Sequence, residues 1–160
     1  MQFEKAGTKD IPELVRMRTE YLSEDYGGLS DDTKAAISAK LPDYFRSHLN
    51  KDCFVFVCRD DEKIVGCCFL CVTEKPSNPS FINGRTGSVL NVYTMPEYRR
   101  QGIAFRLMNR LLKAAEELEL DFVELKATED GYRLYKSLGF EDTVSKYHNM
   151  KFIIGTDNSR

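Results

Sequence analysis

Apolar residues along the chain follow a helical spacing in some stretches and a strand spacing in others, with turn-forming residues between them. Helices are predicted at residues 11–22, 30–50, 102–118 and 131–138. Strands are predicted at residues 3–6, 54–58, 64–73, 87–94 and 122–127, with the last one or two strands within 143–154. Pro42 lies inside the second helical pattern and predicts a break or kink there. This order of elements indicates an α/β or α+β fold in which helices flank a mixed central sheet of six to seven strands.

The spacing changes abruptly between residues 90 and 112, where a strand leads through a basic turn into a helix. Pro96 ends the strand because it has no N–H to donate, and Gly102 and Ala104 place little side chain at the start of the helix. The first N–H groups of a helix have no partner within it, and the helix dipole is positive there. With Arg99 and Arg100 at its rim, the turn is predicted to bind an anion such as a pyrophosphate. A basic loop without a ligand is the alternative interpretation.

Nucleotide-binding patterns fit this turn poorly. Gly102 is not followed by Lys and Ser or Thr, as in a P-loop, and one glycine stands where a dinucleotide fingerprint has three. The motif Pro96-x-x-Arg99-x-x-Gly102-x-Ala104 instead resembles the acyl-CoA signature of the GNAT superfamily of N-acetyltransferases. Downstream, Tyr135-x-x-x-Gly139-Phe140 resembles a second feature of that family. The resemblance extends from about Phe54 to the C-terminus, and it implies that the fourth and fifth strands part and hold coenzyme A in the gap.

The resemblance also implies a set of site residues. Tyr135 stands where the family has the general acid that protonates the leaving thiolate, and a phenol with a pKa near 10 is protonated at neutral pH. Many members carry Asn where this chain has Thr128. The implied cofactor-binding residues are Val92 and Thr94, through their backbone, and Arg99, Arg100, Gln101, Gly102, Ile103, Ala104 and Thr128. The alternatives are that Tyr135 simply packs on the sheet, or that Tyr132, one turn earlier, is confused with it.

The base that takes the proton of the attacking amine has the weakest assignment. Family members often place a carboxylate on the fourth strand or use a chain of waters, and here that strand offers Asn91, which cannot take a proton. Glu24 and Asp25, after the first helix, and Glu129 are the candidates. Each of them also fits a solvated surface carboxylate.

Charge, hydropathy and cysteine content limit the ligands and the cellular compartment that the chain is expected to have. The net charge of −2 gives no argument for nucleic acid or a membrane surface, and no apolar run approaches the ~20 residues that span a bilayer. The five cysteines, an odd number clustered in apolar stretches, indicate reduced thiols. Cys68 and Cys71 lie three apart in a predicted strand and point to opposite faces, so no metal site is predicted. We expect one cytoplasmic domain over residues 1–160, with a loose tail at 155–160.

The leading hypothesis is an N-acetyltransferase that uses acetyl-CoA as co-substrate and transfers the acetyl group directly to a primary amine of a small molecule or peptide. A non-catalytic CoA-binding sensor or regulatory module is the alternative, and a phosphate- or nucleotide-binding domain is a third interpretation of the same turn. An acidic group near the expected acceptor side mildly favours a cationic acceptor, namely Glu20, Glu24, Asp25, Asp31 and Asp32. The sequence leaves the acceptor and the oligomeric state open, including a homodimer.

Overall fold

A computed structural model of the chain describes residues 1–155. Five strands form one sheet in the order β1-β2-β3-β4-β5, and the last pair is parallel while the others are antiparallel. The strands are β1 (Gln2–Lys5), β2 (Cys53–Asp60), β3 (Lys63–Glu74), β4 (Arg85–Thr94) and β5 (Phe122–Glu124). The helices are α1 (Ile11–Asp25), α2 (Asp31–His48), α3 (Ile103–Glu117) and α4 (Tyr132–Ser137), with short 3₁₀ turns at Thr8–Asp10 and Pro96–Tyr98. The predicted mixed sheet flanked by helices is therefore confirmed.

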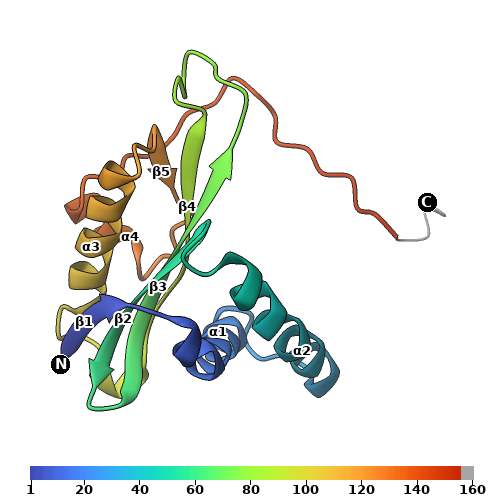
Figure 1. Ribbon diagram of the computed structural model, residues 1–160. Coiled ribbons are helices and arrows are strands. Elements are labelled where there is room, and N and C mark those ends of the chain that lie inside the picture. The colour runs from blue at the N-terminus through green and yellow to red at the C-terminus, as the bar shows by residue number, and fades with distance from the viewer. Residues whose placement is uncertain (156–160) are drawn as a thin grey trace.

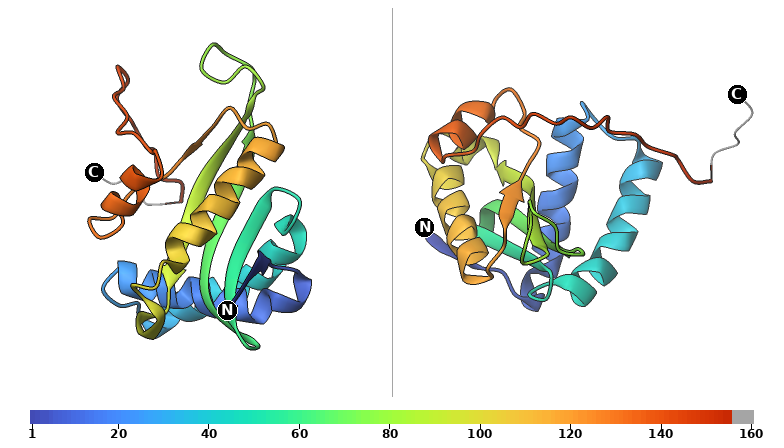
Figure 2. Two further views of the ribbon diagram at one scale, coloured as in Figure 1. Left: turned by 90° about the vertical axis from the view of Figure 1, so that its left-hand side faces the viewer. Right: turned by 90° about the horizontal axis from the view of Figure 1, so that it is seen from above.

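Helices cover both faces of the sheet: α3 and α4 lie on one side, and α1 and α2 on the other (Figures 1 and 2). The alternation of side chains along β3 explains this arrangement. Gly66 faces α3, where a Cβ would lie 2.8 Å from Cγ2 of Ile103. Phe69, three residues on, faces the other side and packs edge-on against Phe45 of α2 with ring centroids 5.8 Å apart. Because both faces are covered, β2 and most of β3 are buried as continuous apolar runs.

The two last strands pair over a short stretch and then part. The parallel ladder joins Thr86–Ser88 to Phe122–Glu124, whereas β4 continues to Thr94. Figure 1 shows β5 beside one end of β4 only. The parting that the family resemblance implies is thus present, and it leaves the far half of β4 without a neighbour on that side.

Two expectations from the sequence are not met. The six to seven strands are not confirmed, because residues 143–154 form no strand and are exposed along their length (Figure 1). A strand needs a neighbour to complete its hydrogen bonds, and an apolar pattern does not supply that neighbour. The break predicted at Pro42 is also absent, since α2 continues through it to His48. Of the tail predicted at 155–160, Gly155 is exposed and residues 156–160 lie outside the described residues.

The close approach of α3 to β3 gives a test of the packing. In Gly66→Ala the new methyl group would meet a branched carbon of Ile103, so we expect unfolding to require about 1–3 kcal/mol less free energy. Gly7→Ala is the matched control, because a Cβ there meets nothing within 4 Å and its φ is −120°. Chemical denaturation measures both variants. Equal stability of the two would contradict this packing.

Candidate active site

A bulge bends β4 at the point where it has left β5. Between the pairs Phe69–Leu90 and Cys67–Tyr93, β3 contributes one residue and β4 contributes two. Asn91 occupies the bulge with a φ of 54°, a left-handed conformation that Asn tolerates better than most residues. Its side chain is buried and held on both sides. Oδ1 accepts a hydrogen bond from Arg18 of α1 at 3.3 Å, and Nδ2 donates to the sulfur of Cys67 at 3.4 Å.

The bulge turns backbone groups of β4 toward the side that β5 has left. The N–H of Met95 donates to the carbonyl of Val65 at 2.9 Å, so Met95 points its backbone groups toward β3. Successive residues of a strand point these groups to alternate sides, so those of Thr94 and Val92 point away from β3. The carbonyl of Thr94 accepts from Nε of Arg99 at 2.8 Å. The backbone of Val92 is therefore directed into the gap, as is the N–H of Thr94.

The start of α3 follows this strand after a short turn, and it has the geometry that an anion site requires. Gly102 precedes the helix with a φ of 75°, and no side chain caps the first turn. The first hydrogen bond of the helix runs from the N–H of Arg106 to the carbonyl of Gly102, so the N–H groups before it have no partner in the helix. The first turn carries no acidic residue, and a Cβ on Gly102 would meet nothing within 4 Å. The turn thus offers open N–H donors with a positive dipole.

The two arginines of the turn differ in their surroundings. Arg99 forms an ion pair with Glu24 at 2.7 Å and lies 5.6 Å from the ring of Tyr93. The hydrogen bond to Glu24 raises the pKa of Arg99. Arg100 is exposed at a φ of 60° and forms no ion pair within residues 1–155. The positive charge of Arg99 is therefore already compensated, and Arg100 is the arginine left at the rim.

The remaining predicted residues of the turn have different environments. Gln101 is exposed, and Ala104 is half-buried. Ile103 is buried and packs toward Gly66, so only its backbone N–H faces the turn.

Tyr135 points into the protein, whereas Tyr132 points out of it. Tyr135 is 9% exposed, and burial raises its pKa to about 12. Its ring packs edge-on against Phe140 with centroids 5.9 Å apart, and its hydroxyl forms no hydrogen bond within the described part of the chain. Tyr132 is 41% exposed and donates to Asp142 at 2.7 Å. Of the two tyrosines, Tyr135 is the one that combines an inward position with a free, protonated hydroxyl.

The ring of Tyr135 lies close to small residues in the turn that precedes α4. A Cβ on Gly131 would lie 2.8 Å from Cε2 of Tyr135 and 3.2 Å from Oγ1 of Thr128. That hydroxyl of Thr128 also accepts a hydrogen bond from the N–H of Gly131 at 3.2 Å. Thr128 thus shapes the turn before α4, and its own O–H is left to donate elsewhere.

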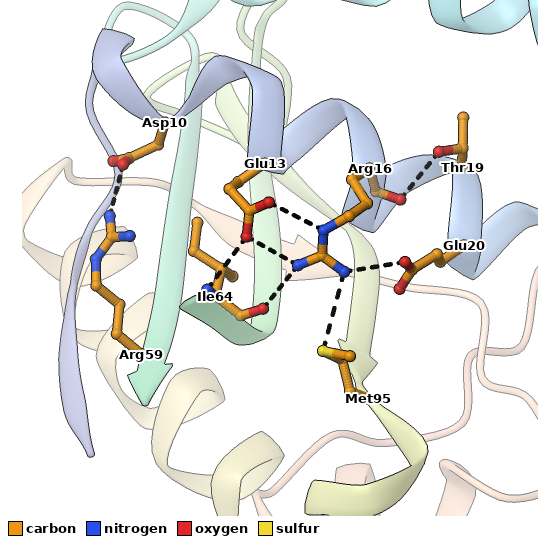
Figure 3. Close-up of polar contacts among 8 residues, drawn as sticks. All are labelled: Asp10, Glu13, Arg16, Thr19, Glu20, Arg59, Ile64 and Met95. Carbon is orange, nitrogen blue, oxygen red and sulfur yellow. Dashed lines mark hydrogen bonds and ion pairs between the residues drawn. The ribbon is translucent and has the colours of Figure 1, made fainter. Parts of the chain in front are cut away.

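A polar network fixes α1 against the sheet (Figure 3). Arg16 donates to Glu13 and Glu20 of its own helix and to the carbonyl of Ile64 at the start of β3. Its Nη1 also lies 3.9 Å from the sulfur of Met95, directly after β4. Earlier in the chain, Asp10 pairs with Arg59 at 2.7 Å. These contacts determine where α1 meets the ends of β3 and β4.

The sequence offered no signal for this network. The contacts that tie it to the sheet join residues remote along the chain, and polar residues on an amphipathic helix suggest solvent exposure.

The candidate bases lie on the periphery. Glu24 is engaged by Arg99, and Asp25 and Glu129 are exposed. On β4 the structure places Asn91 at the bulge and no carboxylate. His48, which the sequence leaves without a partner, lies 2.8 Å from Asp52 at the far end of α2.

A hollow of about 1000 Å³ lies between the second half of α3, β5 and α4. Leu112 and Phe140 contribute to its lining, as does Tyr135, whereas the turn at Gly102 does not. The hollow therefore reaches the candidate acid but not the anion site.

The sequence model of the acetyltransferase (GNAT) family matches residues 14–140. The chain belongs to this family. It is thus an acyltransferase. No match was found among curated proteins.

Solved structures resemble the whole chain. A predicted acetyltransferase from Clostridium acetobutylicum, solved with acetyl-CoA, has 28% identity and a TM-score of 0.82 over 94% of this chain and 95% of that one. A GCN5-related N-acetyltransferase from Ralstonia eutropha JMP134 has 28% identity and a TM-score of 0.76, covering 93% and 97%. A ribosomal-protein-alanine N-acetyltransferase from Brucella melitensis shares the fold at 22% identity, with a TM-score of 0.67 and coverage of 95% and 100%.

No group of three or more metal-binding side chains lies together within residues 1–155. Over the same residues, no helix is both long and apolar enough to cross a membrane.

The buried phenol of Tyr135 gives a spectroscopic test. Because burial raises its pKa to about 12, the phenol should stay protonated through pH 11 and ionise above it. Tyrosinate absorbance of the wild type and Tyr135→Phe should therefore coincide up to pH 11, and the variant should then lack one tyrosine's increment. A difference already complete by pH 10 would contradict the burial of this hydroxyl.

Proposed function

We propose that the chain is an acetyl-CoA-dependent N-acetyltransferase that transfers the acetyl group directly to a primary amine of a small molecule or peptide. The observation that carries the proposal is the parting of β4 from β5 beside the uncapped start of α3. Backbone donors and acceptors of β4 and of the first turn of α3 are left there without partners in the sheet or the helix. A long substrate with an anionic centre and an amide-containing arm, such as coenzyme A, matches that arrangement.

The donor would bind mainly through backbone groups. The pyrophosphate would accept hydrogen bonds from the N–H groups that open α3, with the side chains of Arg100 and Gln101 at the rim. The pantetheine arm would pair with the backbone of Val92 and Thr94, and the O–H of Thr128 would donate to it. The acetyl-CoA in the Clostridium structure supports this choice of donor.

In the transfer step, the amine nitrogen attacks the thioester carbonyl and the carbon–sulfur bond breaks. Tyr135 would donate its proton to the leaving thiolate, which its raised pKa permits because the phenol remains protonated at neutral pH. The amine loses its proton to a base. Glu24 is held by Arg99, and Asp25 forms no ion pair within the described residues, so Asp25, the last residue of α1, is the carboxylate proposed for this role, directly or through water.

The acceptor is proposed to be a cationic amine. Of the acidic group on the acceptor side, Glu20 and Glu24 are compensated by Arg16 and Arg99. The others are exposed and form no ion pair within residues 1–155, namely Asp25, Asp31 and Asp32. Their uncompensated charge would attract a protonated amine.

A non-catalytic CoA-binding module is the alternative, and the lack of a carboxylate on β4 is the observation that favours it. The inward position of Tyr135 favours the enzyme.

A homodimer and a cytoplasmic location stay predictions of the sequence. The exposed apolar side chains of residues 143–154 favour the homodimer, because a second copy of the chain would cover them.

The anion site is tested by introducing charge at the start of α3. Gly102→Glu would place a carboxylate where the pyrophosphate is proposed, so acetyl-CoA binding should weaken. Gly102→Ala is the control, because it carries the same strain at a φ of 75° without the charge. Isothermal titration calorimetry should give a dissociation constant on the order of tenfold higher for Glu than for Ala. Equal constants would place the pyrophosphate elsewhere.

The acid role is tested by removing one oxygen. Tyr135→Phe keeps the ring packing but has no proton to donate, so kcat should fall by about a hundredfold or more while the affinity for acetyl-CoA stays within about threefold. A thiol-release assay with a panel of amines provides the rates. Tyr132→Phe, which removes an outward hydroxyl, should leave kcat nearly unchanged. Undiminished turnover in Tyr135→Phe would refute the assignment, and wild type that binds acetyl-CoA but acetylates no amine would favour the module.

A further inference from the structure

Two cysteines face each other across β2 and β3. Cys53 and Cys71 are direct partners in the ladder, and their sulfur atoms lie 3.9 Å apart. The N–H of Val72 donates to the carbonyl of Asp52 at 2.7 Å, which makes the adjacent pair hydrogen-bonded and the cysteine pair non-hydrogen-bonded. Cα atoms in such a pair are about 4.5 Å apart, within the range of about 4.4–6.8 Å that disulfides occupy.

The other three cysteines lack this arrangement. Cys58 pairs with Gly66, Cys67 with Val57, and Cys68 with Phe56. All three are buried, whereas Cys71 is partly exposed. Among the five cysteines, only Cys53 and Cys71 face each other in the ladder, and Cys71 is a partly exposed residue.

The surroundings of Cys71 favour a reactive thiolate. Hydrogen bonding with Cys53 lowers the pKa of Cys71 below that of a free thiol, and the hydroxyl of Tyr44, 3.8 Å from its sulfur, acts in the same direction, while burial opposes both. Arg18 also favours the thiolate, and Asp52 opposes it. The same contact with Cys71 raises the pKa of Cys53, which therefore keeps its proton. Cys71 is thus the sulfur of the pair that loses its proton first, next to a thiol that can resolve its oxidised form.

We propose that Cys53 and Cys71 form an oxidation site that reacts with peroxides and closes into a reversible cross-strand disulfide. The thiolate of Cys71 attacks one peroxide oxygen, the O–O bond breaks, and hydroxide leaves, which gives a sulfenic acid on Cys71. The sulfur of Cys53 then attacks the sulfur of Cys71 and displaces the hydroxyl, and the proton of Cys53 leaves with it as water. Overall, two thiols and one hydrogen peroxide give one disulfide and two waters. A dithiol reductant reverses the change by thiol–disulfide exchange.

Closure needs only a small rearrangement. The sulfur atoms have to move from 3.9 Å to a bonding distance of about 2.05 Å, which a side-chain rotation of each cysteine accomplishes while the strand pairing is kept. The reaction also removes the thiolate next to the hydroxyl of Tyr44, on the face of the sheet that α2 covers. The site is independent of acetyl transfer and does not rest on the function proposed above.

The full-length chain tests the site directly. Treatment with hydrogen peroxide, followed by non-reducing mass spectrometry, should show a loss of two hydrogens and a peptide link between Cys53 and Cys71, and dithiothreitol should restore the original mass. In Cys53→Ser, the oxidised Cys71 cannot be resolved, so dimedone should label it as a sulfenic acid. Cys58→Ala is the control and should form the same link as the wild type.

Alkylation kinetics provide a second measurement on the unmodified protein. Iodoacetamide should modify Cys71 faster than the three buried cysteines that lack this pairing, and the rate should reach half its maximum at a lower pH than for free cysteine. A link between any other pair of cysteines, or no loss of thiols at peroxide concentrations that oxidise free cysteine, would overturn the proposal.

Discussion

The candidate site depends on the register of β4, which pairs with β3 along its length but with β5 over a short stretch only. On one side it pairs with β3 nearly to its end, and on the other it pairs with β5 only as far as Ser88. The extra residue at Asn91 is accommodated because Asn adopts a left-handed conformation and its side chain is satisfied by Arg18 and Cys67. The result is a row of backbone groups without a neighbouring strand, and such groups need water or a ligand to complete their hydrogen bonds.

Other parts of the chain hold this opening in place. Arg16 fixes α1 to β3 and to the residue after β4, and the ion pair between Glu24 and Arg99 fixes the end of α1 to the turn that precedes α3. From the opposite side, α4 brings Tyr135 inward against Phe140. The end of α1 and the turn before α3 are thus fixed beside β4 by contacts between distant segments, whereas Tyr135 is held by a residue of its own segment. A substitution that removes one of these contacts is expected to act on the site by shifting the helices and strands that surround it.

Features that are local in the sequence could be predicted, and features that depend on remote partners could not. The strand, turn and helix around Gly102 were predictable, because proline, glycine and the apolar stripe of α3 each act within a few residues. The compensation of Arg99 by Glu24 was not, since it joins residues 75 apart in the sequence. The strand predicted within residues 143–154 was not formed for the same reason, because periodicity cannot specify a neighbour. The inward position of Tyr135 matched the family motif, whereas its free hydroxyl required the structure.

The central claim is that acetyl-CoA occupies the gap beside β4 and the start of α3. Amide hydrogen exchange of the full chain, with and without saturating acetyl-CoA, tests it residue by residue. The account predicts slower exchange at the N–H groups of Val92 and Thr94 and at those that open α3, because the ligand would become their hydrogen-bond acceptor. Slower exchange confined to the hollow between α3 and α4, with these amides unchanged, would contradict it.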